Sequence, residues 1–194
     1  MRYGPAILAF MLALVTPTFA LGQQGMPVDK GELTHQQKLD RLFSELKRSQ
    51  NEKVATRIAS RIGQEWAASG SASVDLMMQW AGKALEERKF DVALDFLDQV
   101  VAMRPDYAEG WNRRATVHFM MQNFAKSMAD IEQTLELEPR HFGAISGMAQ
   151  IFMAGGNKQL AFNAYQRVLE IYPMMRNAQN EVVTLSEELE GEAI

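Results

Sequence analysis

Residues 105–139 read PDYAEGWNRRATVHFMMQNFAKSMADIEQTLELEP. This stretch begins and ends with proline, and a further proline follows at position 173. Pro105, Pro139 and Pro173 therefore recur at a fixed spacing of 34 residues. A fixed period between about 20 and 50 residues is typical of a repeat array, in which each unit is one supersecondary element. We therefore expect this part of the chain to consist of stacked copies of one unit.

Each unit has the pattern of two amphipathic helices joined by a short turn. The turns are expected at 87–89, 122–123 and 155–157, where Asn and Gly suit the left-handed backbone that often ends a helix. Each closing proline cannot donate a backbone hydrogen bond, so it ends the second helix and begins the next unit. The units are placed at 74–107, 108–141 and 142–175, with 74–173 as the repeat region.

Bulky and small side chains recur at matching positions of the three units. In chain order these positions hold Met77, Trp111 and Ile145; Ala81, Ala115 and Ala149; Ala93, Ser127 and Ala161; Leu97, Ile131 and Tyr165; Val100, Thr134 and Val168. This pattern resembles the tetratricopeptide repeat (TPR) family, a 34-residue helix–turn–helix repeat. Ala84 and His118 depart from it where the family favours tyrosine, whereas Phe152 keeps an aromatic ring there. The resemblance implies an all-α fold, a right-handed superhelix of antiparallel helix pairs (a TPR α-solenoid).

Two flanking segments are also expected to be helical. Within 35–69, the apolar stripes of HQQKLDRLFSELKRS and NEKVATRIASRIGQEWAAS predict two helices, the second with Asn51 as its N-cap. This pair is either a degenerate first repeat or an N-terminal capping hairpin. Residues 174–190 predict a C-terminal capping helix, because the last repeat of an array leaves one apolar face uncovered.

The N-terminus has the layout of a secretory signal peptide. Arg2 precedes an apolar run at 6–15, and small residues follow, ending with Ala20. The run is short for a membrane span, which needs about 20 apolar residues. We expect residues 1–20 to be the signal peptide, with cleavage after Ala20 or, as the second choice, after Gly22. An uncleaved N-terminal anchor is the alternative. Residues 21–34 read as a flexible linker.

Composition narrows the classes of function. The net charge of −4 leaves no basic surplus to neutralise nucleic-acid phosphates, so no nucleic-acid partner is expected. The chain has no cysteine, which removes disulfides, thiolate catalysis, Cys-based zinc sites and lipoprotein anchoring.

No set of residues predicts catalysis, a metal site or a cofactor. His35, His118 and His141 have no second ligand at metal-binding spacing, and the paired carboxylates fall on exposed faces or helix ends. The GGNK sequence at 155–158 joins two helices and lacks the context of a phosphate-binding loop. The 13 methionines are compatible with a copper carrier, because thioethers are soft metal ligands, but core packing and an adaptable binding surface explain them as well. We therefore expect no enzyme and no cofactor.

The resemblance also implies a binding surface. In the TPR family the first helix of each repeat lines a concave groove that receives an extended peptide or a partner helix. Asn112 occupies a position where a family asparagine holds a ligand backbone, whereas the cationic side chains that would clamp a terminal carboxylate are missing. Mapped onto this sequence, the groove residues are Asp75, Met78, Gly82, Leu85, Glu109, Asn112, Thr116, Phe119, Met120, Gly143, Ser146, Gln150 and Met153.

These features lead to one main functional expectation. The chain is expected to be a non-catalytic adaptor of the bacterial periplasm or cell envelope that binds a segment of another envelope protein in this groove. After signal cleavage it would have no membrane contact. A membrane-anchored assembly factor is the alternative, and an enzyme or metal carrier is the third. The oligomeric state stays open.

Overall fold

The computed structural model describes residues 33–192. The signal peptide expected at 1–20 and most of the linker at 21–34 lie outside the described residues. Within the described range the chain forms nine α-helices and no strand. Their bounds are α1 His35–Arg48, α2 Glu52–Ala67, α3 Ala72–Glu86, α4 Phe90–Met103, α5 Ala108–Met120, α6 Phe124–Leu137, α7 Phe142–Ala154, α8 Lys158–Ile171 and α9 Arg176–Glu192.

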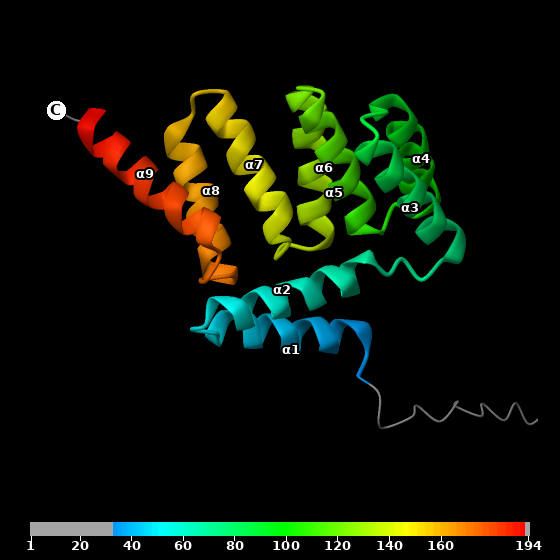
Figure 1. Cartoon of the computed structure of the whole chain (residues 1–194), viewed down its shortest axis with the longest axis horizontal. Coiled ribbons are helices and arrows are strands. Elements are labelled where there is room, and N and C mark those ends of the chain that lie inside the picture. Colours follow the sequence, from blue (N-terminus) through cyan, green and yellow to red (C-terminus); the bar gives the residue numbers. More distant parts are fainter. Residues whose placement is uncertain (1–32, 193–194) are drawn as a thin grey trace, which may run out of the picture. The chain divides into compact units, whose positions relative to one another are not determined.

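Helices α3 to α8 form three antiparallel pairs that stack side by side (Figure 1). The turn inside each pair contains one left-handed residue, and these residues are Arg88, Gln122 and Gly156. They lie 34 residues apart, so the backbone repeats with the period of the prolines. The expected all-α solenoid of helix pairs is confirmed.

Close packing between pairs requires a residue without a side chain at the start of α5. Gly110 is buried, and a Cβ atom at this position would lie 2.8 Å from Val100 Cγ1 and 3.2 Å from Tyr107 Cδ1. A contact that short forces neighbouring atoms to move. The glycine therefore sets how closely the α5–α6 pair approaches α4.

Replacing Gly110 with Ala is expected to lower the free energy of unfolding by about 1–3 kcal/mol, because the added methyl overfills this junction. Gly82→Ala is the matched control, since Gly82 lies within α3 and a Cβ there meets nothing within 4 Å. The control should raise the free energy by about 0.5–1 kcal/mol through helix propensity alone. Urea unfolding followed by circular dichroism measures both. Stabilisation by Gly110→Ala would contradict the packing argument.

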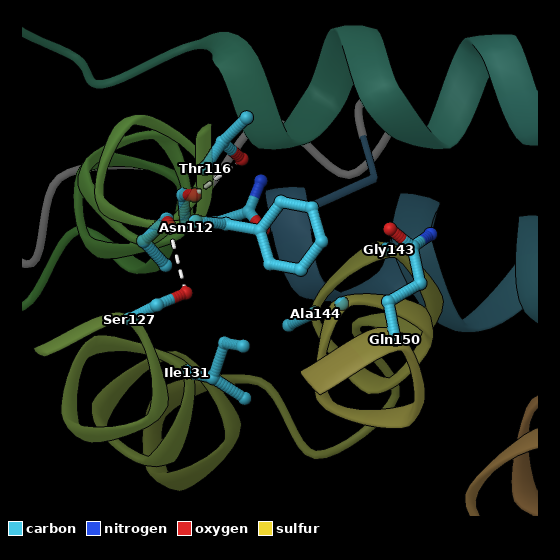
Figure 2. Close-up of a pocket in the computed structure, with 10 residues that line it drawn as sticks. Asn112, Thr116, Ser127, Ile131, Gly143, Ala144 and Gln150 are labelled. Atoms are coloured by element: carbon cyan, nitrogen blue, oxygen red, sulfur yellow. Dashed lines mark hydrogen bonds between the residues drawn. The ribbon is translucent and has the colours of Figure 1, made fainter. Parts of the chain in front are cut away.

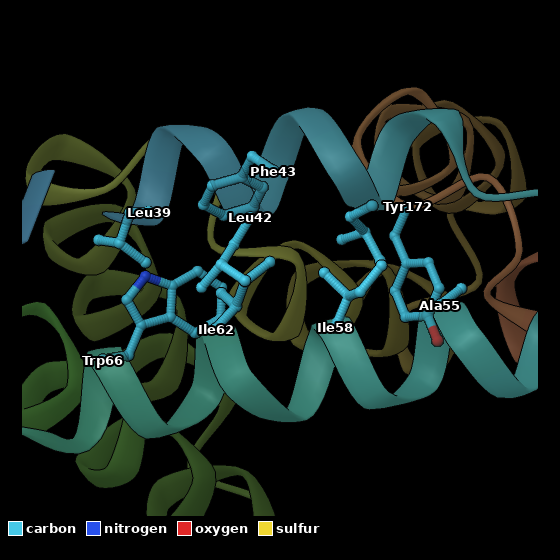
Figure 3. Close-up of a cluster of buried hydrophobic side chains, with 9 residues drawn as sticks. Leu39, Leu42, Phe43, Ala55, Ile58, Ile62, Trp66 and Tyr172 are labelled. Carbon is cyan, nitrogen blue, oxygen red and sulfur yellow. The ribbon is translucent and has the colours of Figure 1, made fainter. Parts of the chain in front are cut away.

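The hairpin α1–α2 has its own caps and its own core. Thr34 and Gln37 form a capping box at the start of α1, and the side chain of Asn51 accepts the amide of Val54 at the start of α2, as expected. The apolar stripes of the two helices face each other (Figure 3). The buried core, which we call the hairpin core, consists of Leu39, Leu42, Phe43, Leu46, Ala55, Ile58, Ile62, Trp66 and Tyr172.

The hairpin does not stack on α3 and α4 as a repeat one period upstream would. It lies crosswise to the repeats, along the edge where the turns between repeats gather (Figure 1). Tyr172, in the turn between α8 and α9, belongs to the hairpin core, and Phe142, Ile171, Met174 and Met175 pack against it. The hairpin therefore joins the second and third repeats along one edge.

Polar contacts hold the hairpin to three successive turns. At the first turn, Tyr107 Oη donates a 2.9 Å hydrogen bond to the carbonyl of Ala67. At the second, Arg140 forms an ion pair with Asp40 at 2.7 Å, and its guanidinium lies 4.2 Å from the ring centre of Phe43. At the third, Arg176 pairs with Glu52. Both turns between repeats and the start of α9 are therefore bound to the hairpin.

Helix α9 covers the last repeat. Ala178 and Leu185 are fully buried against α8, whereas Val183 is 58% exposed. The helix begins two residues later than the expected 174–190 and also ends two residues later, at 192. The apolar side of α9 therefore closes the C-terminal end of the array.

Candidate partner-binding groove

The first helices of the second and third repeats border a pocket of about 180 Å³ (Figure 2). Helix α6 forms its floor, with Ser127 and Ile131. Gly143 and Gly147 lie one turn apart on α7, and their missing side chains leave room between α7 and α5. The full lining, which we call the groove pocket, is Asn112, Ala115, Thr116, Phe119, Ser127, Ile131, Gly143, Ala144, Gly147 and Gln150.

Five of the thirteen expected groove residues meet in this pocket. Asn112, Thr116 and Phe119 come from α5, while Gly143 and Gln150 come from α7. Phe119 is half-buried, and its ring packs against Phe124 with centroids 5.6 Å apart. The pocket therefore combines an aromatic wall with uncharged polar side chains.

The other expected groove residues serve different local roles. Asp75 accepts hydrogen bonds from the amide and hydroxyl of Ser69, so it holds the α2–α3 connection. Ser146 is buried and donates to the carbonyl of Phe142. The rest do not line the groove pocket: Met78 and Leu85 pack against the core of the first repeat, Gly82 is half-buried on α3, and Met120 and Met153 are exposed.

The floor residues Ser127 and Ile131 were not among the expected groove residues. The expectation considered only the first helix of each repeat, whereas these two side chains come from a second helix. The Gly143–Gly147 spacing on α7 is the signal in the sequence that could have indicated an open floor. Ser127 Oγ is already used, since it donates to the carbonyl of Ala115 at 2.8 Å.

Glu109 lies one turn before Asn112 and is buried, so it organises this end of the groove rather than lining it. Its carboxylate accepts from Asn112 Nδ2 at 2.9 Å and from Arg113 Nε at 2.6 Å. His141 Nε2 lies 3.1 Å from the same carboxylate, and His141 Nδ1 accepts the amide of Ala144. Because Nδ1 is an acceptor, the proton of a neutral ring lies on Nε2, which donates to Glu109.

This network reaches the hairpin through an aromatic stack. The rings of Trp66 and His141 lie 4.0 Å apart and nearly parallel, at 12°. Trp66 thus fixes His141, His141 fixes Glu109, and Glu109 fixes the amide of Asn112. The orientation of the groove asparagine therefore depends on a side chain from α2.

The electrostatics of Glu109 follow from these contacts. Burial disfavours its charged form, but the hydrogen bond from His141, together with the charge and hydrogen bond of Arg113, outweighs that effect and holds its pKa below the usual value. Burial, assisted by Glu109, raises the pKa of the Tyr107 phenol. Glu109 is therefore ionised at neutral pH and accepts from all three partners.

Two kinds of feature are absent from residues 33–192. This part of the chain contains no group of three or more His, Cys, Asp or Glu side chains that could hold a metal ion. No helix in it is both long and apolar enough to cross a membrane. Two of the methionine pairs are used in packing. Met77 and Met78 pack against the buried cluster of Val74, Val100 and Tyr107, and Met174 and Met175 pack against the hairpin core.

The stacked helix pairs and the groove between their first helices define a TPR-type solenoid. The family model described as "Tetratricopeptide repeat" matches residues 144–173. A TPR repeat-containing protein of Rhizobium etli is 56% identical over 155 residues, which cover 80% of this chain and 76% of the relative. The chain belongs to the tetratricopeptide repeat family.

More distant similarities are found to one yeast protein by sequence and to solved TPR domains by fold. The small glutamine-rich tetratricopeptide repeat-containing protein 2 of Saccharomyces cerevisiae is 24% identical over 117 residues, 60% of this chain and 34% of that protein. The first TPR of Spaghetti (RPAP3), solved bound to the HSP90 peptide SRMEEVD, superposes with a TM-score of 0.57 at 24% identity, covering 60% and 92% of the two chains. The TPR2B domain of yeast Sti1 in its pHsp70 complex gives a TM-score of 0.56 at 15% identity, covering 61% and 99%.

Proposed function

We propose that this protein is a non-catalytic adaptor of the bacterial periplasm that binds a segment of another envelope protein in the groove pocket. The observation that carries the proposal is that Asn112, Thr116, Phe119 and Gln150, from two different repeats, line one pocket. Two of the solved TPR domains with this fold were determined with peptide or protein ligands, which supports peptide binding as the general activity.

The lining of the pocket indicates the chemistry of the ligand. No Lys, Arg, Asp or Glu lies among its lining residues. A segment that ends in a carboxylate or is rich in acids would find no counter-charge there. An uncharged segment with an apolar anchor against Phe119 fits better, with Asn112 and Gln150 bonding to its backbone.

The test is affinity capture from an envelope extract with the tagged full chain, read by mass spectrometry. The variant is Asn112→Ala/Phe119→Asp, which removes the amide and places a charge on the aromatic wall. Loss of such anchors typically costs about 2 kcal/mol or more, so a partner should lose roughly thirtyfold or more in affinity. Far-UV circular dichroism of the variant should stay unchanged.

The matched control for this test is Asn163→Ala/Val183→Asp. It makes the same two chemical changes at exposed sites on α8 and α9, outside the groove pocket. A partner retained by the control and the wild type but lost by the groove variant would support the adaptor. Equal recovery from all three proteins would overturn the groove assignment.

The periplasmic location rests on the signal-peptide pattern of residues 1–20, which lie outside the described residues. Cell fractionation with N-terminal sequencing tests it independently of the groove. Periplasmic protein that begins at Leu21 is the expected result. Membrane-bound protein that still begins at Met1 would instead favour the alternative, an anchored assembly factor.

A further inference from the structure

The first repeat differs from the other two on the side where a preceding repeat would stack. The 34-residue period makes Leu76, Gly110 and Ala144 equivalent, and it does the same for Trp80, Arg114 and Met148, and for Phe96, Asp130 and Ala164. The contacts that these positions make in the second and third repeats show their role in stacking one repeat on the next.

In the second repeat these positions form the junction with α4. Gly110 is buried so close to Val100 that a Cβ would lie 2.8 Å from it. Arg114 donates to Asp98 of α4 at 2.8 Å. In the third repeat, buried Ala144 packs with Ile131 of α6. At both internal junctions, then, the positions equivalent to Leu76 and Trp80 contact the second helix of the preceding repeat.

In the first repeat the same positions hold large apolar side chains that no other helix of residues 33–192 fully covers. Leu76 is 43% exposed and Trp80 is 46% exposed. The rings of Trp80 and Phe96 pack 5.4 Å apart, and with Val92 they border a hollow of about 350 Å³. We call this surface of α3 and α4 the end face.

The end face is not shaped to receive another repeat at the usual spacing. A leucine stands where the internal junctions have glycine or alanine, and even one added methyl at Gly110 would collide with the preceding helix. This difference also gives a reason why the α1–α2 hairpin lies along the edge of the array instead of stacking on α3. Exposed, clustered aromatic and aliphatic side chains of this kind typically mark an interaction surface.

We propose that the end face binds a second copy of this chain across a two-fold axis. The face carries the exposed side chain of Leu76 and, one turn further along α3, the hollow beside Trp80, so an apolar side chain of one copy could enter the hollow of the other. Its rim carries both signs of charge: Glu87 pairs with Lys89 at 2.7 Å, and Lys83 lies beside them. Across a two-fold axis, Lys83 of one copy could reach Glu87 of the other. An isologous contact requires a patch that can match its own copy in this way.

The other end of the array favours a closed pair over a filament. Helix α9 covers α8 with Ala178 and Leu185, so the surface that would take a following repeat is already occupied. Head-to-tail stacking would need both ends open. With only the N-terminal end open, association through the end face stops at two copies.

The test is sedimentation equilibrium of the full chain over a concentration series. The wild type should approach twice the single-chain mass of 21.9 kDa as its concentration rises. Trp80→Arg introduces the residue that the second repeat has at the equivalent position, and it should remain at the single-chain mass with an unchanged helical spectrum. Val183→Arg makes a comparable change on exposed α9 and should behave as the wild type.

Residues 33–194, which form a compact unit, serve as a second sample. A single-chain mass for the full-length wild type at every concentration would overturn the proposal. If residues 33–194 paired while the full chain did not, the N-terminal residues of the same chain would be the occupant instead. A Trp80→Arg variant that still paired would move the interface away from the end face.

A labelling experiment checks the position of the interface directly. The chain has no cysteine, so Lys89→Cys places a single reactive site at the rim of the end face. Spin labels at this site should show dipolar coupling between copies, and mixing with unlabelled protein should remove it. Coupling from labels at Val183→Cys, with none at Lys89→Cys, would place the contact at the opposite end.

Discussion

Replacing Trp66 with Ala is expected to lower the free energy of unfolding by about 3–5 kcal/mol, the usual cost of removing a buried large aromatic ring. Trp66 is only 9% exposed, stacks on His141, and packs on Phe43 and Phe142 at centroid distances of 5.9 and 5.0 Å. Its loss removes the contact that joins the hairpin core to the turn before α7. Urea unfolding monitored by circular dichroism measures the change.

Two further measurements make the Trp66 prediction specific. Trp66→Phe keeps a ring against His141 and should lose less than about 1.5 kcal/mol, since it loses volume but no packing partner. Limited proteolysis should cut Trp66→Ala in the 68–71 connection much faster than Trp66→Phe, because the hairpin opens. A loss below about 1 kcal/mol for Trp66→Ala would show that the hairpin does not depend on this stack.

Replacing Asp130 with Ala is expected to cost about 3 kcal/mol, because it breaks a largely buried ion pair and leaves a guanidinium with little solvent. Arg114 donates to both carboxylate oxygens of Asp130, at 2.7 and 2.9 Å, and the two side chains are only 19% and 6% exposed. The pair lies where the second repeat meets the first.

Asp98→Ala is the matched control for the Asp130 prediction. It removes the other carboxylate that contacts Arg114, but the Asp98 side chain is 62% exposed. An exposed pair contributes about 0–1 kcal/mol. The free energies of unfolding of the two variants, measured by thermal and urea unfolding, should therefore differ by about 2 kcal/mol or more, with Asp130→Ala the less stable. Equal effects would show that burial does not set the strength of this pair.

The repeats were predictable because their signal is periodic. The prolines and the small residues recur every 34 positions, and a helix pair stacks on a nearly identical neighbour, so one unit predicts the next. The position of the left-handed turn residue was less predictable. In the second repeat, residue preference favours Asn123, but the left-handed residue is Gln122, and in the first repeat it is Arg88. The repeat length decides which residue occupies this position of the turn.

The hairpin was predictable as two helices but not in its position. The stripes of α1 and α2 show which faces are buried, whereas no local pattern shows what lies opposite. Leu76 does indicate that the hairpin cannot stack on α3, because Leu76 is too large for the position that Gly110 and Ala144 occupy at the junctions between repeats. This indication becomes readable only after the structure shows how close Gly110 lies to α4.

The groove was predicted in part for a similar reason. Family spacing indicates which positions of α5 and α7 face one side, and the structure brings Asn112, Thr116, Phe119 and Gln150 together there. Spacing cannot show that Ser146 turns inward to the carbonyl of Phe142, nor that the Asp75 carboxylate is used by Ser69. Both depend on hydrogen bonds that form only once the connections between helices are in place.

The edge-bound hairpin changes how this solenoid folds. In an open array each repeat contacts only its neighbours, so folding can start anywhere and the ends can fray one unit at a time. Here Arg140 bonds to a residue 100 positions earlier and Arg176 to one 124 positions earlier. Such contacts require closure of a long loop, so we expect them to form late in folding. Because fraying at the C-terminal end would break contacts with the N-terminal helices, we expect the described array to lose its structure as one cooperative unit.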